Sequence, residues 1–415
     1  MSTPSPISTS LPAAFFKRAL AAFWYRDFRV LWLGAFMSTV GTWTQKVAQS
    51  WLILDLTNSS FYLGLDDFLS QLPILLFTLI GGVIADRHDR RRLLIGSQFI
   101  QMATAFALAG LVFQDRVHIG HILALSFTAG LAQAFGGPAY QAMIPSLVDK
   151  KDLPNAIALN SIQFNLARVF GPLIAGATMA GLGIVGCFTF NGISFLVVIL
   201  AIASVRVRHT PPADRKPILH ELKGGFTYAR SEPSIIALTV LASMTTFLGL
   251  PLVTFLPVFA REIFGGGVSH YAVMVACSGM GAVLGALVVA WLGRFRHMGL
   301  ALLLIQMVFG ALIVAFAFTR LYWLNNVLLF LCGAALLMVF SMTTSLVQMI
   351  VPDHLRGRVV SIYMVAFRGG MPLGSLASGF AASLAPLPIV LAVNGALVSL
   401  VAVYFFFHSR EVREL

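Results

Sequence analysis

The stretch that decides the fold is GGVIADRHDRRRLL, residues 81–94. A long apolar run ends at its glycine pair, two aspartates and four arginines follow within seven residues, and the apolar sequence then resumes. The chain of 415 residues is 58% apolar and only 11% charged, whereas soluble domains carry roughly 25% charged residues. Because so little charge cannot cover a globule with polar surface, lipid must be the main solvent. The charged stretch is therefore a short loop between two membrane spans.

Apolar runs long enough to cross a bilayer, about 20 residues each, recur along the whole chain. The sequence predicts an all-α integral membrane protein with twelve transmembrane helices. These spans are predicted at residues 29–55, 61–85, 93–113, 121–148, 157–181, 184–205, 235–260, 270–293, 299–319, 322–351, 359–383 and 387–408.

Basic residues are distributed unevenly between the two sets of loops. Of the 28 lysines and arginines, 22 lie in the terminal segments, the central polar stretch and the loops on that same side. Only Arg116, Arg261 and Arg320 lie on the opposite side. By the positive-inside rule both termini are cytoplasmic, and without a transit peptide we expect a bacterial inner membrane. The net charge of +12 is thus a topology signal, and no nucleic-acid partner is expected.

A polar stretch divides the chain into two halves that resemble each other. Arg168 and Pro172 in the first half match Arg368 and Pro372 in the second at an offset of 200. Repeated halves related by an axis along the membrane normal place a substrate site at their interface. The expected units are a cytoplasmic segment 1–27, a six-helix bundle 28–205, a cytoplasmic linker with an amphipathic helix 206–234, a second six-helix bundle 235–409 and a cytoplasmic tail 410–415.

The charged loop also carries a sequence pattern. The pattern G-x-x-x-D-R-x-[GD]-R-[RK] is matched by Gly82, Asp86, Arg87, Asp89, Arg90 and Arg91. In this loop it resembles the signature of the major facilitator superfamily of transporters, as do the twelve spans and the long central loop. VAQSWLILDLTNS (47–59) and NLARVFGPLIAG (165–176) further resemble the branch that contains the enterobactin exporter and the macrolide efflux proteins. RVFGPLIAG is similar to the Gly-Pro motif of the superfamily's antiporters.

The resemblance implies a gating role for this loop. Gly82 would let two helices approach closely. Asp86 would accept hydrogen bonds from the positive N-terminal end of the eleventh span, across the boundary between the halves. The arginines would pair with Asp89 or with lipid phosphate. Such a latch would close the cytoplasmic side. In the alternative interpretation the arginines only anchor the topology.

Ionisable residues inside membrane spans are costly and indicate function. Arg168 and Arg368 lie about ten residues into their helices, roughly 15 Å deep at 1.5 Å per residue. An arginine fork suits carboxylate, catecholate or phosphate groups, so one or both arginines are candidates to bind the cargo. The alternative is that each caps carbonyls freed by the nearby prolines, Pro172 and Pro372.

A second charged group is predicted near the outer mouth. Lys46 on the first span can reach Asp66 or Asp67 on the antiparallel second span. Burial disfavours a charged carboxylate and a nearby lysine favours it, so these three residues are candidates for proton coupling. The alternative is that the aspartates are interfacial and hydrated. Further polar candidates for cargo binding are Gln45, Gln49, Gln71, Gln141, Gln163, Asn165, Thr245 and Gln348.

The function predicted from these features is a proton-coupled exporter of a small amphiphilic molecule, a siderophore-like metabolite or a drug, working by alternating access. A lipid or lysolipid flippase, or an importer, is the alternative on the same fold. Without a P-loop pattern, a metal-ligand cluster or a nucleophile–base motif we expect neither ATP use nor a cofactor, and no enzyme. The expected partners are the cargo, protons and membrane lipids, with the protein as a monomer.

Overall fold

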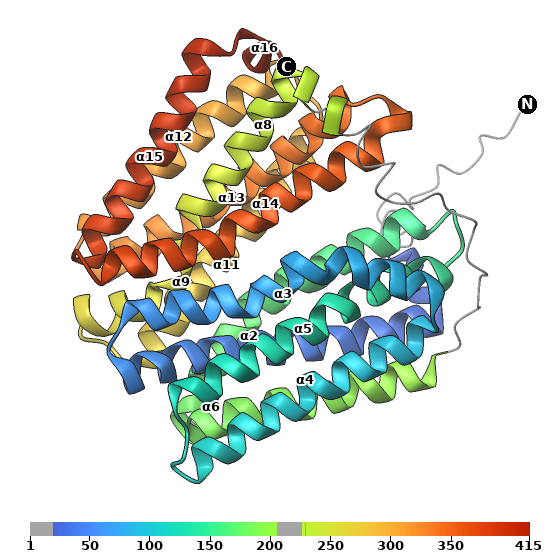
Figure 1. Cartoon of the computed structure of the whole chain (residues 1–415), viewed down its shortest axis with the longest axis vertical. Helices are drawn as coiled ribbons and strands as arrows, with labels where there is room; N and C mark the ends of the chain where they lie inside the picture. Colours follow the sequence, from blue (N-terminus) through green and yellow to red (C-terminus); the bar gives the residue numbers. More distant parts are fainter. Residues whose placement is uncertain (1–19, 206–225, 229) are drawn as a thin grey trace, which may run out of the picture.

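The computed structural model describes residues 20–205, 226–228 and 230–415, and all regular structure in that part is helical. The first half contains α2 to α6, and the second half α8 to α16 (Figure 1). The elements of the first half are η1 (Ala21–Trp24), α2 (Arg26–Thr57), α3 (Ser60–Arg87), α4 (Arg90–Phe113), α5 (Ile119–Met143), η2 (Ile144–Ser146) and α6 (Leu153–Ser204). Those of the second half are α8 (Pro233–Met244), η3 (Thr245–Gly249), α9 (Pro251–Thr254), α10 (Leu256–Val258), η4 (Phe259–Ile263), α11 (Val268–Leu292), α12 (Met298–Phe318), α13 (Tyr322–Ile350), α14 (Asp353–Ala382), α15 (Leu387–His408) and α16 (Arg410–Glu414).

The helices account for the predicted spans. Ten stretches of the described chain are long and apolar enough to cross a membrane. One of them is α6, which has 52 residues and turns at Gly183, where φ is +67°. Only glycine adopts such a backbone readily, so α6 makes two passes. The 32-residue α2 supplies the twelfth. The predicted all-α fold is confirmed, with helix ends within a few residues of the prediction except where noted below.

The seventh span differs from the continuous helix predicted at 235–260. Its α-helical pieces α8, α9 and α10 are separated by the π-helical turns η3 and η4. Pro251 and Pro257 lie in this stretch, and proline lacks the N–H that a helix needs and clashes with the preceding turn. The predicted span is present as Pro233–Ile263, and these prolines account for its irregular geometry.

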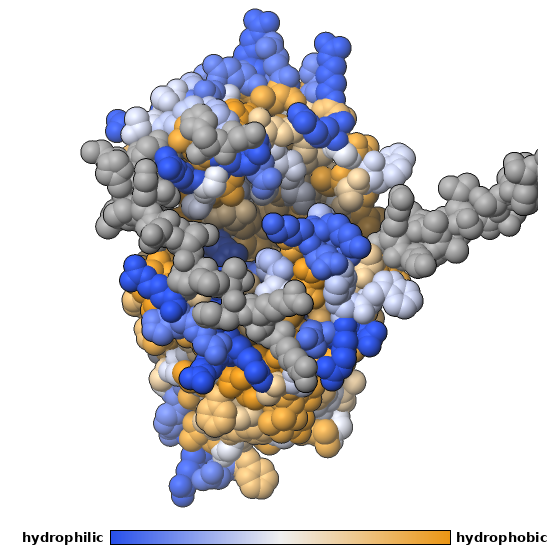
Figure 2. Space-filling model, turned by 90° about the vertical axis from the view of Figure 1, so that its right-hand side faces the viewer, coloured by the Kyte–Doolittle hydropathy of each residue, from blue (hydrophilic) through white to orange (hydrophobic). Residues whose placement is uncertain are grey.

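The two halves contact each other at one end of the molecule only. In Figure 1 they meet at the left and diverge to the right. We call the left end, with the loops at 58–59 and 114–118, the distal end. The right end, with the loop at 88–89 and the residues 408–415, is the terminal end. Viewed from the terminal end, the space-filling surface is hollowed between the two halves (Figure 2), and we call this the central hollow.

Two helix pairs form most of the contact between the halves. In the first pair, Gly64 of α3 lies directly against the backbone carbonyl of Ser375 of α14. In the second pair, a Cβ on Gly279 of α11 would lie 3.2 Å from the backbone carbonyl of Arg168 on α6. Glycine permits these close approaches because it has no side chain. The contacts set the position of the charged residues described below.

The cytoplasmic segments predicted before the first half and between the two halves are only partly described. Residues 1–19 and most of the predicted linker, 206–225 together with 229, lie outside the described residues. The expected amphipathic helix therefore stays a prediction. At the start of the first half, η1 leads directly into α2, and the side chain of Trp24 is 72% exposed.

Candidate transport site

An ion pair and a hydrogen bond join three helices at the contact between the halves. Lys46 Nζ of α2 lies 3.0 Å from Asp67 Oδ1 of α3. The other carboxylate oxygen of Asp67 accepts a hydrogen bond of 2.8 Å from the Ser375 hydroxyl of α14. Asp67 is 4% exposed and Ser375 is fully buried. The carboxylate thus binds a cation in its own half and a donor in the other half.

This group extends further into the second half. The hydroxyls of Ser375 and Thr254 of α9 lie 3.1 Å apart. Thr254 belongs to the broken seventh span, so the hydrogen-bonded group reaches a helix with irregular geometry. The close approach at Gly64, one turn from Asp67, brings the serine into reach. A buried charge needs such partners because its desolvation is costly.

Asp66 occupies a different environment from its neighbour. Its carboxylate accepts hydrogen bonds from Gln49 Nε2 at 2.9 Å and from the Ser126 hydroxyl of α5 at 2.6 Å. Gln45 donates to Gln49 at 3.4 Å and accepts from Asn191 of α6 at 2.7 Å. These partners all belong to the first half. Of the two predicted pairs with Lys46, only that with Asp67 forms.

A second polar contact crosses the boundary at the distal end. Arg261 of η4 donates to the backbone carbonyl of Leu54 at 3.2 Å and lies 3.6 Å from Asp55. The carbonyl belongs to the last turn of α2, where a cation is favoured. Trp51 of α2 also stacks on Tyr271 of α11, with ring centroids 6.5 Å apart. The sequence analysis assigned Arg261 to a loop and missed this role, although an arginine beside helix ends was a usable signal.

The two arginines within the spans have no polar partner among the described residues. The Arg168 guanidinium lies over the Trp43 ring, 5.8 Å from its centroid, and Arg368 is exposed. Neither donates a hydrogen bond to a carbonyl in the part of the chain that the structure describes. The alternative that they cap carbonyls freed by Pro172 and Pro372 is therefore not what the structure shows.

The charged loop at the terminal end stabilises the first half. Asp89 caps the N-terminus of α4 by accepting from the backbone N–H of Arg91 at 2.9 Å. Arg90 donates to the carbonyl of Ala142, in the last turn of α5, at 3.1 Å. Arg91 donates to the carbonyl of Ile202 at 3.1 Å and to that of Ala203, at the end of α6. These arginines thus hold helix ends of one half together, a role that the sequence analysis missed.

The predicted gating contacts of this loop are only partly visible. Nothing lies within 4 Å of the position of a Cβ on Gly82, whereas Gly81 lies against the carbonyl of Ala134 on α5. In this conformation Gly81 and not Gly82 makes the close approach, and the gating role of Gly82 stays a prediction. The Arg92–Asp89 pair, 3.5 Å, is exposed, and so is Arg87. The side chain of Asp86 lies outside the described part, and the latch to the eleventh span stays a prediction.

Some of the other polar candidates form hydrogen bonds within the described part of the protein, and the others do not. Gln163 donates to the Thr39 hydroxyl at 2.8 Å. Asn165 donates to the Ser161 carbonyl and Thr245 to the Leu241 carbonyl, each within its own span. These three have hydrogen-bond partners within the protein and contribute to packing. Gln141 and Gln348 are exposed and Gln71 is half-buried, so these three keep side chains available to a cargo.

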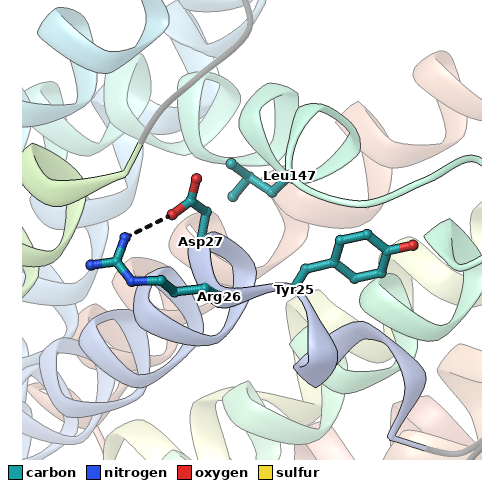
Figure 3. A pocket seen from close by; sticks show the side chains of 4 residues that line it. All are labelled: Tyr25, Arg26, Asp27 and Leu147. Carbon is teal, nitrogen blue, oxygen red and sulfur yellow. Dashed lines mark hydrogen bonds and ion pairs between the residues drawn. The ribbon is translucent and has the colours of Figure 1, made fainter.

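A pocket at the terminal end of the first half is lined by Tyr25, Arg26, Asp27 and Leu147 (Figure 3). Arg26 pairs with Asp27 at 3.4 Å, and both groups are open to water. The Tyr25 hydroxyl donates to Asp152 at 2.7 Å, and this hydrogen bond raises the pKa of Tyr25 to about 12. Tyr25 therefore stays protonated at physiological pH. The pocket is a surface feature remote from the contact between the halves. Within the described residues, no group of three His, Cys, Asp or Glu side chains could hold a metal ion.

Twelve spans in two halves, with buried charges where the halves meet, define a membrane transporter of the major facilitator fold. The family model described as "Transmembrane secretion effector" matches residues 17–415, so the chain belongs to this family of the superfamily.

Curated relatives cover nearly the whole chain. The staphyloferrin A transporter of Staphylococcus aureus is 27% identical, over 91% of this chain and 95% of the relative. Macrolide efflux protein A of Streptococcus pyogenes is 20% identical, over 92% and 95%. The enterobactin exporter EntS of Shigella boydii is 24% identical, over 86% of each. The resemblance to the enterobactin-exporter and macrolide-efflux branch is thereby confirmed.

Solved structures show the same fold. A bacterial homologue of the human lysosomal transporter Spinster, in an inward-facing and unoccupied conformation, superimposes with a TM-score of 0.70 at 17% identity. The alignment covers 94% of this chain and 97% of that one. The nucleoside transporter NupG gives a TM-score of 0.71 at 14% identity, over 92% and 98%.

Proposed function

We propose that the protein exports a small amphiphilic molecule, a siderophore-like metabolite or a drug, by alternating access. The names of the relatives support this direction, since they include an enterobactin exporter and a macrolide efflux protein. The excess of basic residues at the terminal end supports cytoplasmic termini in a bacterial inner membrane. The protein would act as a monomer. The exposed arginines of the terminal end would bind the phosphate groups of lipids.

In this orientation the central hollow, which is seen in Figure 2, opens to the cytoplasm. The contacts of the distal end, such as the hydrogen bond from Ser375 to Asp67, close the halves towards the outside. The conformation is then the inward-open one, ready to take up a cargo from the cytoplasm. The predicted latch of the charged loop would form only after the halves have rocked to the outward-open state. That order agrees with the absence of a close neighbour at Gly82 in this conformation.

The proposal of proton coupling rests on one observation, the carboxylate of Asp67 bound to both halves. As a carboxylate, Asp67 attracts Lys46 and holds the Ser375 hydroxyl, which stabilises the closed distal end. A proton on Asp67 removes the negative charge and weakens both interactions. Protonation of Asp67 and closure of the distal end would then be linked, so a change in the protonation of this carboxylate would shift the equilibrium between the two open conformations.

Other charged and titratable groups surround this carboxylate. Lys46 faces it from α2, Asp66 adjoins it on α3, and Tyr271 lies near it on α11. Lys46 is the second member of the proton-coupling group. Asp66 stays a candidate, but its hydrogen bonds run within the first half, so its protonation has no direct effect on the contact between the halves.

Transport in proteoliposomes, with and without a pH gradient, tests this proposal. We expect Asp67→Asn to abolish the stimulation by the gradient while cargo counterflow persists, because counterflow needs no coupling. Asp66→Asn is the matched control and keeps gradient-driven transport. Gradient-driven transport by Asp67→Asn at the wild-type rate contradicts the role of Asp67. Inward transport of the cargo under a physiological gradient would favour an importer.

A further inference from the structure

The unpartnered arginines lie where the two halves meet. The backbone of Arg168 on α6 lies against Gly279 of α11, in the other half. Arg368 on α14 precedes Gly369, where an added Cβ would lie 3.5 Å from the Leu75 side chain of α3. Each arginine therefore stands in one of the two helix pairs that join the halves, at equivalent positions of the repeat.

Helical geometry places the Arg368 side chain on the face of α14 that meets α3. Arg368 precedes Ser375 by seven residues, which is two turns, or about 10 Å, on the same face of the helix. Ser375 faces α3, because it binds Asp67. Towards the terminal end, the side chains of Leu76 of α3 and Val365 of α14 are 55% and 45% exposed. Arg368, which is itself exposed, thus lies at the edge of the contact between the halves.

The charge of these arginines is not balanced inside the protein. Lys46, the other cation within the spans, is paired with Asp67. Asp66 is bound by Gln49 and Ser126. No described carboxylate pairs with Arg168 or Arg368, and arginine does not lose its proton. An unpaired cation within a membrane span is costly, so an anionic group from outside the protein would be stabilised beside each guanidinium.

Aromatic rings lie next to both arginines. Trp43 lies under Arg168, and Phe164, one turn away on α6, packs edge-on against Trp43. Phe367, adjacent to Arg368, packs against Phe340 and Tyr363. Rings beside a guanidinium suit a molecule that carries both an apolar body and acidic groups.

We propose that Arg168 and Arg368 form one cargo site for a small amphiphile with two separated anionic oxygen groups, carboxylate or phosphate. One arginine from each half binds one group, so a single cargo bridges both halves. This inference rests on the proposed export function, because it takes the hollow as the path of the cargo. It restricts the cargo to anionic molecules and so excludes neutral and cationic drugs.

Binding to the full-length protein in lipid nanodiscs tests the site. The probes are citrate, its uncharged triethyl ester and inorganic phosphate, and the readout is tryptophan fluorescence with calorimetry. We expect citrate to bind and the ester not to bind. Arg168→Gln and Arg368→Gln should each weaken citrate binding at least about tenfold, as the loss of a charge-assisted pair requires. Tighter binding of phosphate than of citrate would assign the site to phosphate oxygens.

Two further variants exclude misfolding as the cause. Arg368→Lys keeps the charge and loses the fork, and should fall between the wild type and Arg368→Gln. Arg320→Gln removes an exposed arginine at the distal end and should bind citrate like the wild type. Equal binding of citrate and the ester, unchanged citrate affinity in both glutamine variants, or no saturable binding of citrate or phosphate would each overturn the site.

The same preparations separate this inference from the export proposal. Arginine-dependent binding of citrate without gradient-driven transport of any probe would reject export and keep the anion site. Gradient-driven export of the uncharged ester, insensitive to both arginine substitutions, would keep export and reject the anion site.

Discussion

The distal and terminal ends of the interface are held by different kinds of contact. At the distal end, single polar contacts cross from one half to the other, from Asp67 to Ser375 and from Arg261 to the carbonyl of Leu54. At the terminal end, the arginines of the charged loop bind carbonyls of their own half, as Arg91 does at Ile202. Contacts within a half keep it rigid, and the few polar contacts between the halves can break without unfolding either one. This difference is what rocking of two rigid halves requires.

The largest effect on the contact between the halves is expected from Gly64→Val. A valine there would place its side chain against the backbone carbonyl of Ser375, which cannot move away without shifting α14. Overpacking of this kind costs about 1–3 kcal/mol, so the closed distal end should lose about tenfold or more in population. Gradient-driven transport should fall accordingly.

Gly110→Ala is the matched control for Gly64→Val, since nothing lies within 4 Å of its Cβ position. Both variants are checked for folding by size-exclusion chromatography. Wild-type transport by Gly64→Val would show that the contact between α3 and α14 is dispensable.

An effect of similar size is expected from Ser375→Ala. The variant loses one hydrogen bond to a carboxylate, worth about 1.5–3 kcal/mol when the acceptor is charged, and keeps the Lys46 pair. The distal end should open about tenfold more often, measured as reactivity of a cysteine introduced at Thr254 towards a membrane-impermeant maleimide. Ser361→Ala is the control, because Ser361 bonds only its own helix, at the carbonyl of Gly357. Equal reactivity in the two serine variants would show that the hydrogen bond from Ser375 to Asp67 does not help to close the distal end.

The smallest effect is expected from Arg261→Gln. Arg261 is 35% exposed and its partner Asp55 is 62% exposed, and exposed ion pairs contribute about 0–1 kcal/mol. The distal end should open no more than about fivefold more often, and high salt should reduce the difference between wild type and variant. A loss of transport as large as that of Gly64→Val would mean that Arg261 does more than close the distal end.

The sequence predicted the fold and the pairing of Lys46 with an aspartate, because hydropathy, loop charge and antiparallel neighbours are local properties. It did not distinguish Asp66 from Asp67. Adjacent residues on a helix point about 100° apart, so the rotation of α3 decides which one faces α14. For the same reason the sequence did not indicate that Gly81, and not Gly82, lies against α5 in this conformation. A one-residue difference becomes visible only when the neighbouring helix is in place.

Contacts that bring distant segments together were beyond the sequence. Arg261 binds the end of α2 across more than 200 residues, and Arg91 binds the end of α6. The sequence around either arginine does not indicate which carbonyl it binds. The positive-inside rule treats the loop arginines as one class, whereas the structure gives Arg90 and Arg91 partners at helix ends and leaves Arg87 exposed.

Distance distributions between spin labels test most directly whether Asp67 controls the two ends. One label pair, at Lys150 and Arg296, reports on the terminal end, and a second, at Asp115 and Arg320, on the distal end; all four positions are exposed. In nanodiscs, we predict that Asp67→Asn lengthens the distal distance and shortens the terminal one, while Asp66→Asn leaves both as in the wild type. Identical distributions for Asp67→Asn and the wild type, or equal shifts in the two variants, would contradict control of the halves by Asp67.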